Sequence, residues 1–215
     1  MDRVITSLRT FKLTKDIRRA LETLDRRLPQ ESDVSNHFLK LYREEWIGPE
    51  QYIYMDTKLL LNRFCLSTER LFSERDVTIG VYFFDSAEKR LWVGADPSVP
   101  KHFSEYANGL FVIGDIVDGE TPEYVKRVVP IGDVDRSEHL ISLNHRKDLL
   151  KADLRSFCTV PLLHNGRVIG HMNLFSRQPK AWSSEEILLI RRQATSIERR
   201  LMDVRDRFVQ AAATI

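Results

Sequence analysis

The sequence predicts an α+β fold: an antiparallel sheet flanked by helices, with an N-terminal helical extension before it and a long helix after it. Toward both ends of the chain, apolar residues recur at spacings of three and four, as they do on one face of a helix. Between them lie short runs rich in β-branched and aromatic residues, which are typical of strands. One pair of these runs is joined by Asn165-Gly166, the signal of a tight antiparallel hairpin.

Residues 1–50 predict an N-terminal helical region. One apolar face runs through a first helix until Pro29 ends it, and a second helix is expected over residues 33–46. The apolar contacts of the second helix are expected to be Val34, Phe38, Leu41 and Trp46. The first 27 residues hold eight basic and four acidic side chains. This excess could attract an acidic partner, but it is more often the solvated face of an amphipathic helix.

Residues 51–205 predict the main domain, in which helices alternate with strands. A helix is expected to begin at Asp56 and to run to about residue 73, with Leu60, Phe64 and Leu71 facing inward. The expected strands cover residues 76–85, 90–96, 110–115, 155–163 and 166–176.

A long C-terminal helix is expected to begin at Ser183, because Ser183 and Glu186 have the spacing of a capping box. It is expected over residues 184–209, and residues 206–215 form its end and tail. Its apolar residues follow an unbroken heptad pattern, which we call the heptad seam: Ile187, Ile190, Ala194, Ile197, Leu201, Val204 and Phe208. The seam either packs on the sheet of its own chain or meets a partner helix, which would come from the N-terminal helices of the same chain or from a second copy. The unbroken seam favours a helical contact in a homodimer.

Composition limits the function classes. The chain has 215 residues, of which 42% are hydrophobic and 30% charged, so it can bury a sizeable core. A formal net charge of +2 argues against a strongly cationic nucleic-acid binder. There is no apolar run of about 18 residues, so no association with a membrane is expected. Cys65 and Cys158 are too few for a disulfide framework and predict a cytoplasmic location.

The sequence shows no known catalytic or metal-binding motif. None of the six histidines pairs with another at four-residue spacing or lies beside cysteines at zinc-ligand spacing, so no metal is expected. Glycine-rich phosphate loops and hydrolase motifs do not occur in the sequence either. The chain is therefore not expected to be an enzyme.

Two stretches carry a resemblance to a known family. The segment from Arg155 to Leu201 joins a Val-Pro-Leu strand, an Asn-Gly hairpin, a Val-Ile-Gly strand and a Ser-x-x-Glu helix start. Residues 94–110, GADPSVPKHFSEYANGL, form the second stretch. In this order the elements resemble a GAF domain of the bacterial signalling type, over residues 56–205. The resemblance implies a regulatory or sensory protein with a small ligand on the sheet face away from the terminal helices.

The sequence also departs from branches of that family. The photoreceptor branch holds a bilin on a cysteine of the middle segment, and no cysteine lies between Cys65 and Cys158, so no covalent chromophore is expected. The free-methionine sulfoxide reductase branch uses middle-segment cysteines and acidic residues on two strands. The matching strand positions here are Phe157, Asn173 and Phe175, so the resemblance implies that this activity is lost.

Strand alternation predicts which side of the sheet holds a ligand. One face is expected to be apolar, with Val77, Ile79, Val81 and Phe83 on the first strand and Val168, Gly170, Met172 and Leu174 on the last. The other face, which we call the mixed face, combines polar and aromatic side chains, including Ile169 and His171 on the last strand. The candidate ligand-binding residues are Thr78, Tyr82, Trp92, Phe111, Phe157, Thr159, His171, Asn173 and Phe175. The alternative is that these polar groups only bond the middle segment that folds over them.

Three functions remain open. In the first, a small molecule closes residues 97–150 over the sheet and shifts the terminal helices of a homodimer, which signal to a partner protein. In the second, the fold is a ligand-free dimerisation or protein-interaction module, with Tyr106, Phe111 and Tyr124 filling the pocket. In the third, which the missing cysteines disfavour, the chain is an enzyme like the free-methionine sulfoxide reductases.

Overall fold

The computed structural model describes residues 31–85, 89–111, 127–137 and 143–214. Its centre is one antiparallel sheet of six strands in the order β3-β2-β1-β6-β5-β4. The strands are β1 (Val77–Asp85), β2 (Arg90–Ala95), β3 (Leu110–Phe111), β4 (Val129–Ile131), β5 (Ser156–His164) and β6 (Arg167–Ser176). The predicted α+β class and the four longer strands are confirmed. The short β4 was not predicted, because three residues with a central proline give too little strand signal.

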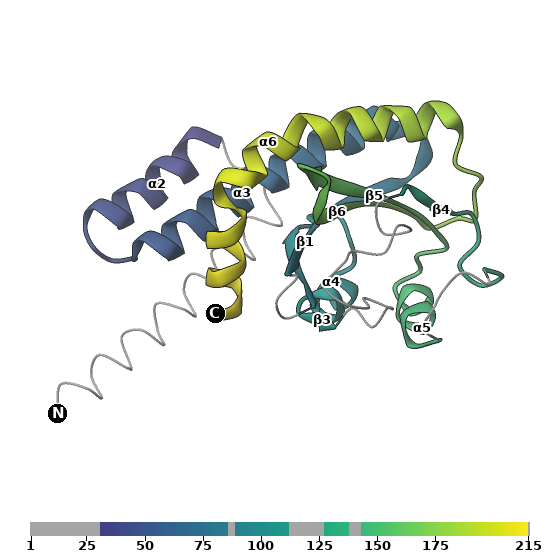
Figure 1. Cartoon of the computed structure of the whole chain (residues 1–215), viewed down its shortest axis with the longest axis horizontal. Coiled ribbons are helices and arrows are strands. Elements are labelled where there is room, and N and C mark those ends of the chain that lie inside the picture. The colour runs from purple at the N-terminus through teal and green to yellow at the C-terminus, as the bar shows by residue number, and fades with distance from the viewer. Residues whose placement is uncertain (1–30, 86–88, 112–126, 138–142, 215) are drawn as a thin grey trace.

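Helices cover both faces of this sheet (Figure 1). The long helices α3 (Pro49–Glu69) and α6 (Ser184–Thr214) lie side by side over one face, which we call the helix face. The short helices α4 (Lys101–Ala107) and α5 (Leu143–Lys151) lie on the opposite side. Within the part of the chain that the structure describes, no helix is both long and apolar enough to cross a membrane.

The described part of the N-terminal region is a pair of helices. Helix α2 (Glu31–Arg43) packs on the first turns of α3 around a small core of Phe38, Ile47, Met55 and Leu59. Trp46 was predicted to join this core, but it lies in the turn after α2 and is 61% exposed. Ile47, its neighbour, takes the inward position instead. The helix predicted before Pro29 lies outside the described residues.

Both ends of α3 differ from the prediction. The helix begins seven residues before Asp56, because Gly48 and Pro49 form its start and the Gly48 N–H donates to Gln51 Oε1 at 2.8 Å. After Glu69 the chain tightens into the 3₁₀ helix η1 (Arg70–Arg75), which changes the phase of the side chains. Phe72 is therefore buried, whereas Leu71, predicted to face inward, is 53% exposed.

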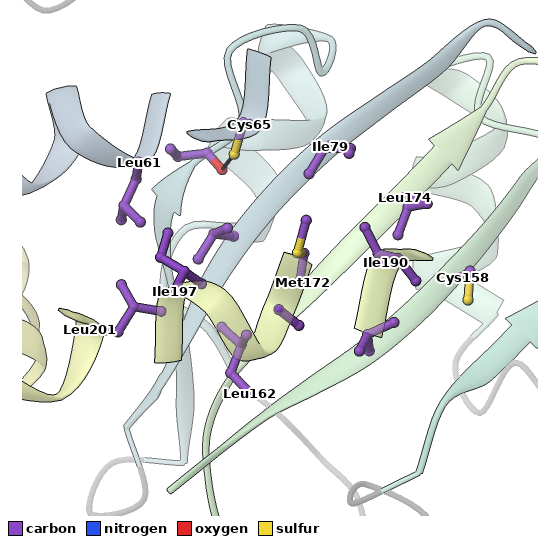
Figure 2. Close-up of a cluster of buried hydrophobic side chains, with 14 of the residues drawn as sticks. Leu61, Cys65, Ile79, Cys158, Leu162, Met172, Leu174, Ile190, Ile197 and Leu201 are labelled. Carbon is purple, nitrogen blue, oxygen red and sulfur yellow. Dashed lines mark hydrogen bonds between the residues drawn. The ribbon is translucent and has the colours of Figure 1, made fainter. Parts of the chain in front are cut away.

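The largest core lies between the sheet and its two long helices (Figure 2). The four apolar residues predicted on one face of β1 all belong to it, together with Met172 and Leu174 of β6. Leu61 and Cys65 enter from α3, and both are fully buried. This arrangement confirms the predicted apolar face for β1 and for Met172 and Leu174, whereas Val168, predicted on the same face, is not part of this core.

The start of α6 is anchored as its sequence predicts. Glu186 N–H donates to Ser183 Oγ at 3.2 Å, and Ser183 N–H donates to Glu186 Oε2 at 2.8 Å, so the capping box is confirmed. The buried Glu186 carboxylate also accepts from Lys180 Nζ at 2.7 Å. Trp182, packed under Lys180, donates its indole N–H to the Ile131 carbonyl of β4 at 3.3 Å.

As far as Leu201, the heptad seam packs on the sheet of its own chain, which was the alternative to the favoured dimer contact. Ile190, Ala194, Ile197 and Leu201 are all buried in the helix-face core, and Ile187 is partly buried against it. A helix on a sheet needs the same spacing of apolar residues as a helix in a coiled coil, so the pattern alone could not separate the two. The side chains of Val204 and Phe208 lie outside the described residues.

A β-bulge changes the faces of β6 near its start. Leu162 pairs with Gly170 but Leu163 pairs with Val168, which leaves Ile169 as an extra residue. Ile169 was predicted on the mixed face, yet the bulge turns it into the helix-face core. The predicted hairpin itself is confirmed, since Asn165 and Gly166 both have positive φ, at 48° and 75°.

Candidate functional site

The mixed face of the sheet carries a second core rich in aromatic side chains. Tyr82, Phe157 and Phe175 rise from β1, β5 and β6, as predicted. Phe103 and Tyr106 of α4 pack against these residues from the other side of the core. Aliphatic residues of the second core fill the space around the rings: Val93, Val99, Ile131, Val134, Leu149 and Leu154.

The rings contact one another edge to face or at tilted angles rather than in parallel stacks. Phe175 is the hub, with ring centroids 6.5 Å from Tyr82, 5.5 Å from Phe103 and 6.3 Å from Phe157. His145 of α5 completes the group, at 6.0 Å from Phe103 and Tyr106 and 6.5 Å from Phe157. The group provides apolar walls of the kind that small-molecule sites use.

Polar side chains lie in a row across the middle of the same face. The strand register puts Thr159 opposite Asn173 and Asn173 opposite Gly80, with Thr78 one step along β1. The Thr78 hydroxyl and the Asn173 carbonyl oxygen Oδ1 are both buried, and neither has a hydrogen-bond partner. A buried polar atom without a partner costs about 1–3 kcal/mol, so two on one face mark a place where an additional molecule could bond.

Tyr82 lies flat over Gly80 in this row. A Cβ at position 80 would be 2.6 Å from the Tyr82 ring, so only glycine leaves room for this orientation. The phenol donates to Asp96 Oδ2 at 3.4 Å, and Ser104 of α4 donates to Asp96 Oδ1 at 2.9 Å. Burial, and then the nearby Asp96 carboxylate, raise the pKa of Tyr82 well above its usual value. The phenol is thus neutral and fixes the sheet to the loop that precedes α4.

Two histidines, His145 and His171, lie at the site and differ in their surroundings. Burial among the rings lowers the pKa of His145, an effect that the nearby Asp148 partly opposes. The imidazole of His145 is therefore neutral at neutral pH. His171 is half-buried on β6, paired with Tyr82 in the ladder on one side and with Pro161 on the other.

Two of the predicted ligand-binding residues are not placed on this face. Trp92 pairs with Phe83, and its side chain packs against the helix-face core. Gly94 forms a bulge in β2, so the register of the β1–β2 hairpin could not be read from alternation alone. Phe111 ends β3, and its side chain lies outside the described residues.

Two residues of the site, Phe103 and His145, were not predicted, and Tyr106 was predicted only to fill the pocket in the ligand-free alternative. Phe103 and Tyr106 stand three residues apart in the segment 94–110. Their helical spacing is a signal that could have placed them on one helix face. His145 had none, because only the folded chain brings α5 over the sheet.

Two further features of the described residues concern regions away from the mixed face. A surface hollow of about 280 Å³ lies at the end of α3, lined by Leu66, Glu69, Arg70, Phe72, Asp76 and Val77. Both oxygens of the Glu69 carboxylate there already accept bonds, from Ile79 N–H and from the Ser98 hydroxyl. Among the described residues, no group of three or more histidine, cysteine or acidic side chains could hold a metal ion.

A comparison of the sequence with protein-family models shows the family to which the chain belongs. A model described as the GAF domain matches residues 73–201, more than half of the chain. None of the curated proteins matches.

Solved structures show a related fold. One similar structure is a domain from a protein assigned as a two-component sensor histidine kinase of Sinorhizobium meliloti 1021. It has a TM-score of 0.55 and 15% identity, over 70% of this chain and 94% of that one. Another is the blue-light absorbing form of the PixJ GAF domain from Thermosynechococcus elongatus. It has a TM-score of 0.51 and 17% identity, over 74% of this chain and 92% of that one. At such identities the likeness concerns the fold alone.

Proposed function

Because the chain belongs to the GAF domain family, we propose that it is a regulatory or sensory domain that binds a small molecule on the mixed face of its sheet. Binding there would alter the packing of the segments that cover the face and, through the sheet, the terminal helices. Those helices would carry the signal to a partner protein. The change must come from a difference in ligand affinity between two arrangements of the chain.

One observation carries this proposal: among the described buried polar atoms without a hydrogen-bond partner, Thr78 Oγ1 and Asn173 Oδ1 lie together in the polar row of the mixed face. Polar atoms inside proteins are almost always bonded, so an exception on the face where a ligand is expected supports binding there. The Asn173 oxygen accepts hydrogen bonds, and the Thr78 hydroxyl can accept or donate one. A ligand that offers a hydrogen-bond donor to these atoms would remove their desolvation cost.

The surroundings indicate the chemistry of such a ligand. Phe103, Phe157 and Phe175 form apolar walls, and the neutral His145 adds no charge. Asp96, the charged group described nearest to Tyr82, already accepts bonds from Tyr82 and Ser104. We therefore propose an uncharged molecule with a flat apolar part and at least one N–H or O–H donor.

Native mass spectrometry of the gently purified full chain tests the proposal. We expect an adduct on the wild-type protein, and its loss in an Asn173→Leu variant, which keeps the size of the side chain but removes the acceptor. A Gln178→Leu variant changes an exposed amide after the end of β6, outside the polar row, and should keep the adduct. Extraction and mass analysis of the released molecule would then identify it. A wild-type protein that stays free of adducts when cell extract is added would contradict the proposal.

The alternative is a ligand-free interaction module, and Tyr82 is the observation that favours it. Its ring is only 2% exposed and already covers Gly80, the centre of the polar row. In that case the chain's own side chains would serve as the permanent occupant of the face. The mass measurement above separates the two candidates directly.

We also propose that the chain is not an enzyme. Both cysteines are buried and unpaired. Burial raises the pKa of Cys158 to about 12 and that of Cys65 well above its usual value, so neither forms the thiolate that thiol chemistry requires. Unpaired cysteines are also in keeping with the reducing cytoplasm that we propose as its location. Turnover of free methionine sulfoxide in a thiol-coupled assay would contradict this part of the proposal.

Homodimerisation remains part of the proposal in a narrower form. The seam as far as Leu201 is used within the chain, so a dimer would have to form through residues beyond it, where Val204 and Phe208 continue the pattern. Light scattering coupled to size-exclusion chromatography checks this. We expect twice the mass of one chain, and a single-chain mass would contradict it.

A further inference from the structure

The β-bulge at Ile169 lies where the ladder between β1 and β6 ends and the ladder between β5 and β6 is interrupted. On one side, the ladder between β1 and β6 stops at the pair Phe83–Gly170. On the other side, the bulge separates the pairs Leu162–Gly170 and Leu163–Val168. Backbone groups at this point need partners from outside the sheet.

Two charged side chains of α6 supply those partners. Glu198 Oε1 accepts a hydrogen bond from the Leu163 N–H at 2.8 Å. Arg205 donates from Nε to the Ile169 carbonyl at 3.3 Å and from Nη2 to the Phe84 carbonyl. Phe84 and Ile169 would form the next pair of the β1–β6 ladder, so the guanidinium takes the place of that pair.

Glu198 and Arg205, which we call the α6 clamp, stand seven residues apart and so share one face of the helix. Leu201, between them, is buried in the helix-face core. The clamp therefore fixes the position of α6 along the sheet by directional bonds, which apolar packing does not provide. Just beyond the clamp, α6 continues to Thr214.

Only one residue pair of the β1–β6 ladder separates the clamp from the candidate ligand site. Tyr82 pairs with His171, and the next pair is Phe83 with Gly170, the last before the clamp. A Cβ on Gly170 would collide with the Tyr82 carbonyl, so the two strands approach closely here. A shift of Tyr82 on the mixed face must therefore move the carbonyl groups that Arg205 holds.

We infer that the α6 clamp is the connection through which the state of the mixed face reaches the C-terminal part of α6. Glu198 and Arg205 act as positioning residues: they touch no ligand but bond the strand ends that a ligand would move. By linkage, a change in α6 must alter the mixed face by the same free energy. The inference rests on the proposed function, because it explains how a change at the ligand site reaches α6. Its test, however, needs no ligand.

Backbone hydrogen exchange of the full chain, followed by mass spectrometry, is the experiment. Gly80→Ala would displace the Tyr82 ring and so stand in for a ligand; Tyr82→Phe, which removes only the phenol hydroxyl, is a milder second perturbation. Each of these two substitutions is made in three backgrounds: wild type, Arg205→Met and Arg192→Met. The Arg205→Met variant keeps the apolar stem of the side chain but loses its hydrogen-bond donors. Arg192 is exposed on α6 and serves as the matched control.

In the wild-type and Arg192→Met backgrounds we expect either perturbation to raise exchange several-fold in residues 201–214. In the Arg205→Met background exchange of this segment should already be about tenfold faster, and the perturbation should add nothing. An Arg205→Lys variant, with one donor group in place of a fork, should restore part of the response. The same response in all three backgrounds, or none in the wild type, would overturn the inference. Failure to find a ligand would contradict the proposed function only, because this result stands without one.

Discussion

The two faces of the sheet are built from the same strands but differ in kind. On the helix face, β1, β5 and β6 present side chains such as Ile79, Leu162 and Met172, all fully buried against α3 and α6. On the mixed face the same strands present aromatic rings and a polar row, of which two atoms have no partner. One face is filled mainly by aliphatic side chains, and the other combines packed rings with polar side chains.

This difference shows how alternation separates stability from function in one sheet. Because neighbouring residues point to opposite faces, a strand can contribute to a dense core with every second residue and to a site with the others. The cost of unpaired polar atoms is then borne by a fold whose stability comes from elsewhere. Truncating an aliphatic side chain of the helix face and removing an unpaired polar atom of the mixed face should accordingly have opposite effects on the free energy of unfolding.

The largest effect is expected on the helix face. Leu174→Ala would leave a cavity among fully buried neighbours and should lower the free energy of unfolding by about 2–5 kcal/mol. Urea denaturation followed by circular dichroism measures the change. A loss below about 1 kcal/mol would show that this core adjusts to cavities, and the contrast between the faces would weaken.

A smaller effect, with the opposite sign, is expected one residue away. Asn173→Leu removes a buried oxygen that has no partner, so it should raise the free energy of unfolding of the ligand-free protein by about 1 kcal/mol. The same urea titration, on protein stripped of adducts, checks this. A clear destabilisation would mean that Asn173 supports the fold, which is the alternative left open by the sequence.

The smallest effect concerns pH. Burial lowers the pKa of His145 below its ordinary value of 6.5, so the unfolded chain binds the proton more readily than the folded chain does. Stability should therefore fall as the pH drops through 6.5, and the loss should be complete below the folded pKa. His145→Phe keeps an aromatic ring without a titratable group, so its unfolding free energy should fall less between pH 7.5 and pH 5. Equal losses in the two proteins would contradict the prediction.

The sequence predicted the fold well because each signal was local. The Asn165-Gly166 turn, the Ser183–Glu186 capping box and the alternation along β1 depend on neighbouring residues, and all three are confirmed. The predictions were wrong where the position of a side chain depends on the segment that the helix or strand packs against. The heptad seam could not reveal that it faces a sheet, and alternation along β6 could not reveal the bulge at Ile169.

The candidate site could be predicted only in part for a related reason. Tyr82, Phe157 and Phe175 follow from strand alternation, and the structure places them together. Trp92 fails because the bulge at Gly94 sets the register of β2, which periodicity does not contain. His145 reaches the rings only through the packing of α5 over the sheet, a contact between segments far apart in the sequence.

The exposed position of Trp46 means that the three tryptophans of the chain can report on different regions by their fluorescence. The chain has three tryptophans: Trp46 is 61% exposed beside α2, Trp92 packs at the edge of the helix-face core, and Trp182 is buried under Lys180. An indole in water emits at longer wavelength than one inside a core. Loss of the main domain would thus shift the emission of Trp92 and Trp182 toward red while that of Trp46 stayed constant. Single-tryptophan variants would turn this unequal exposure into a region-by-region record of how the chain opens.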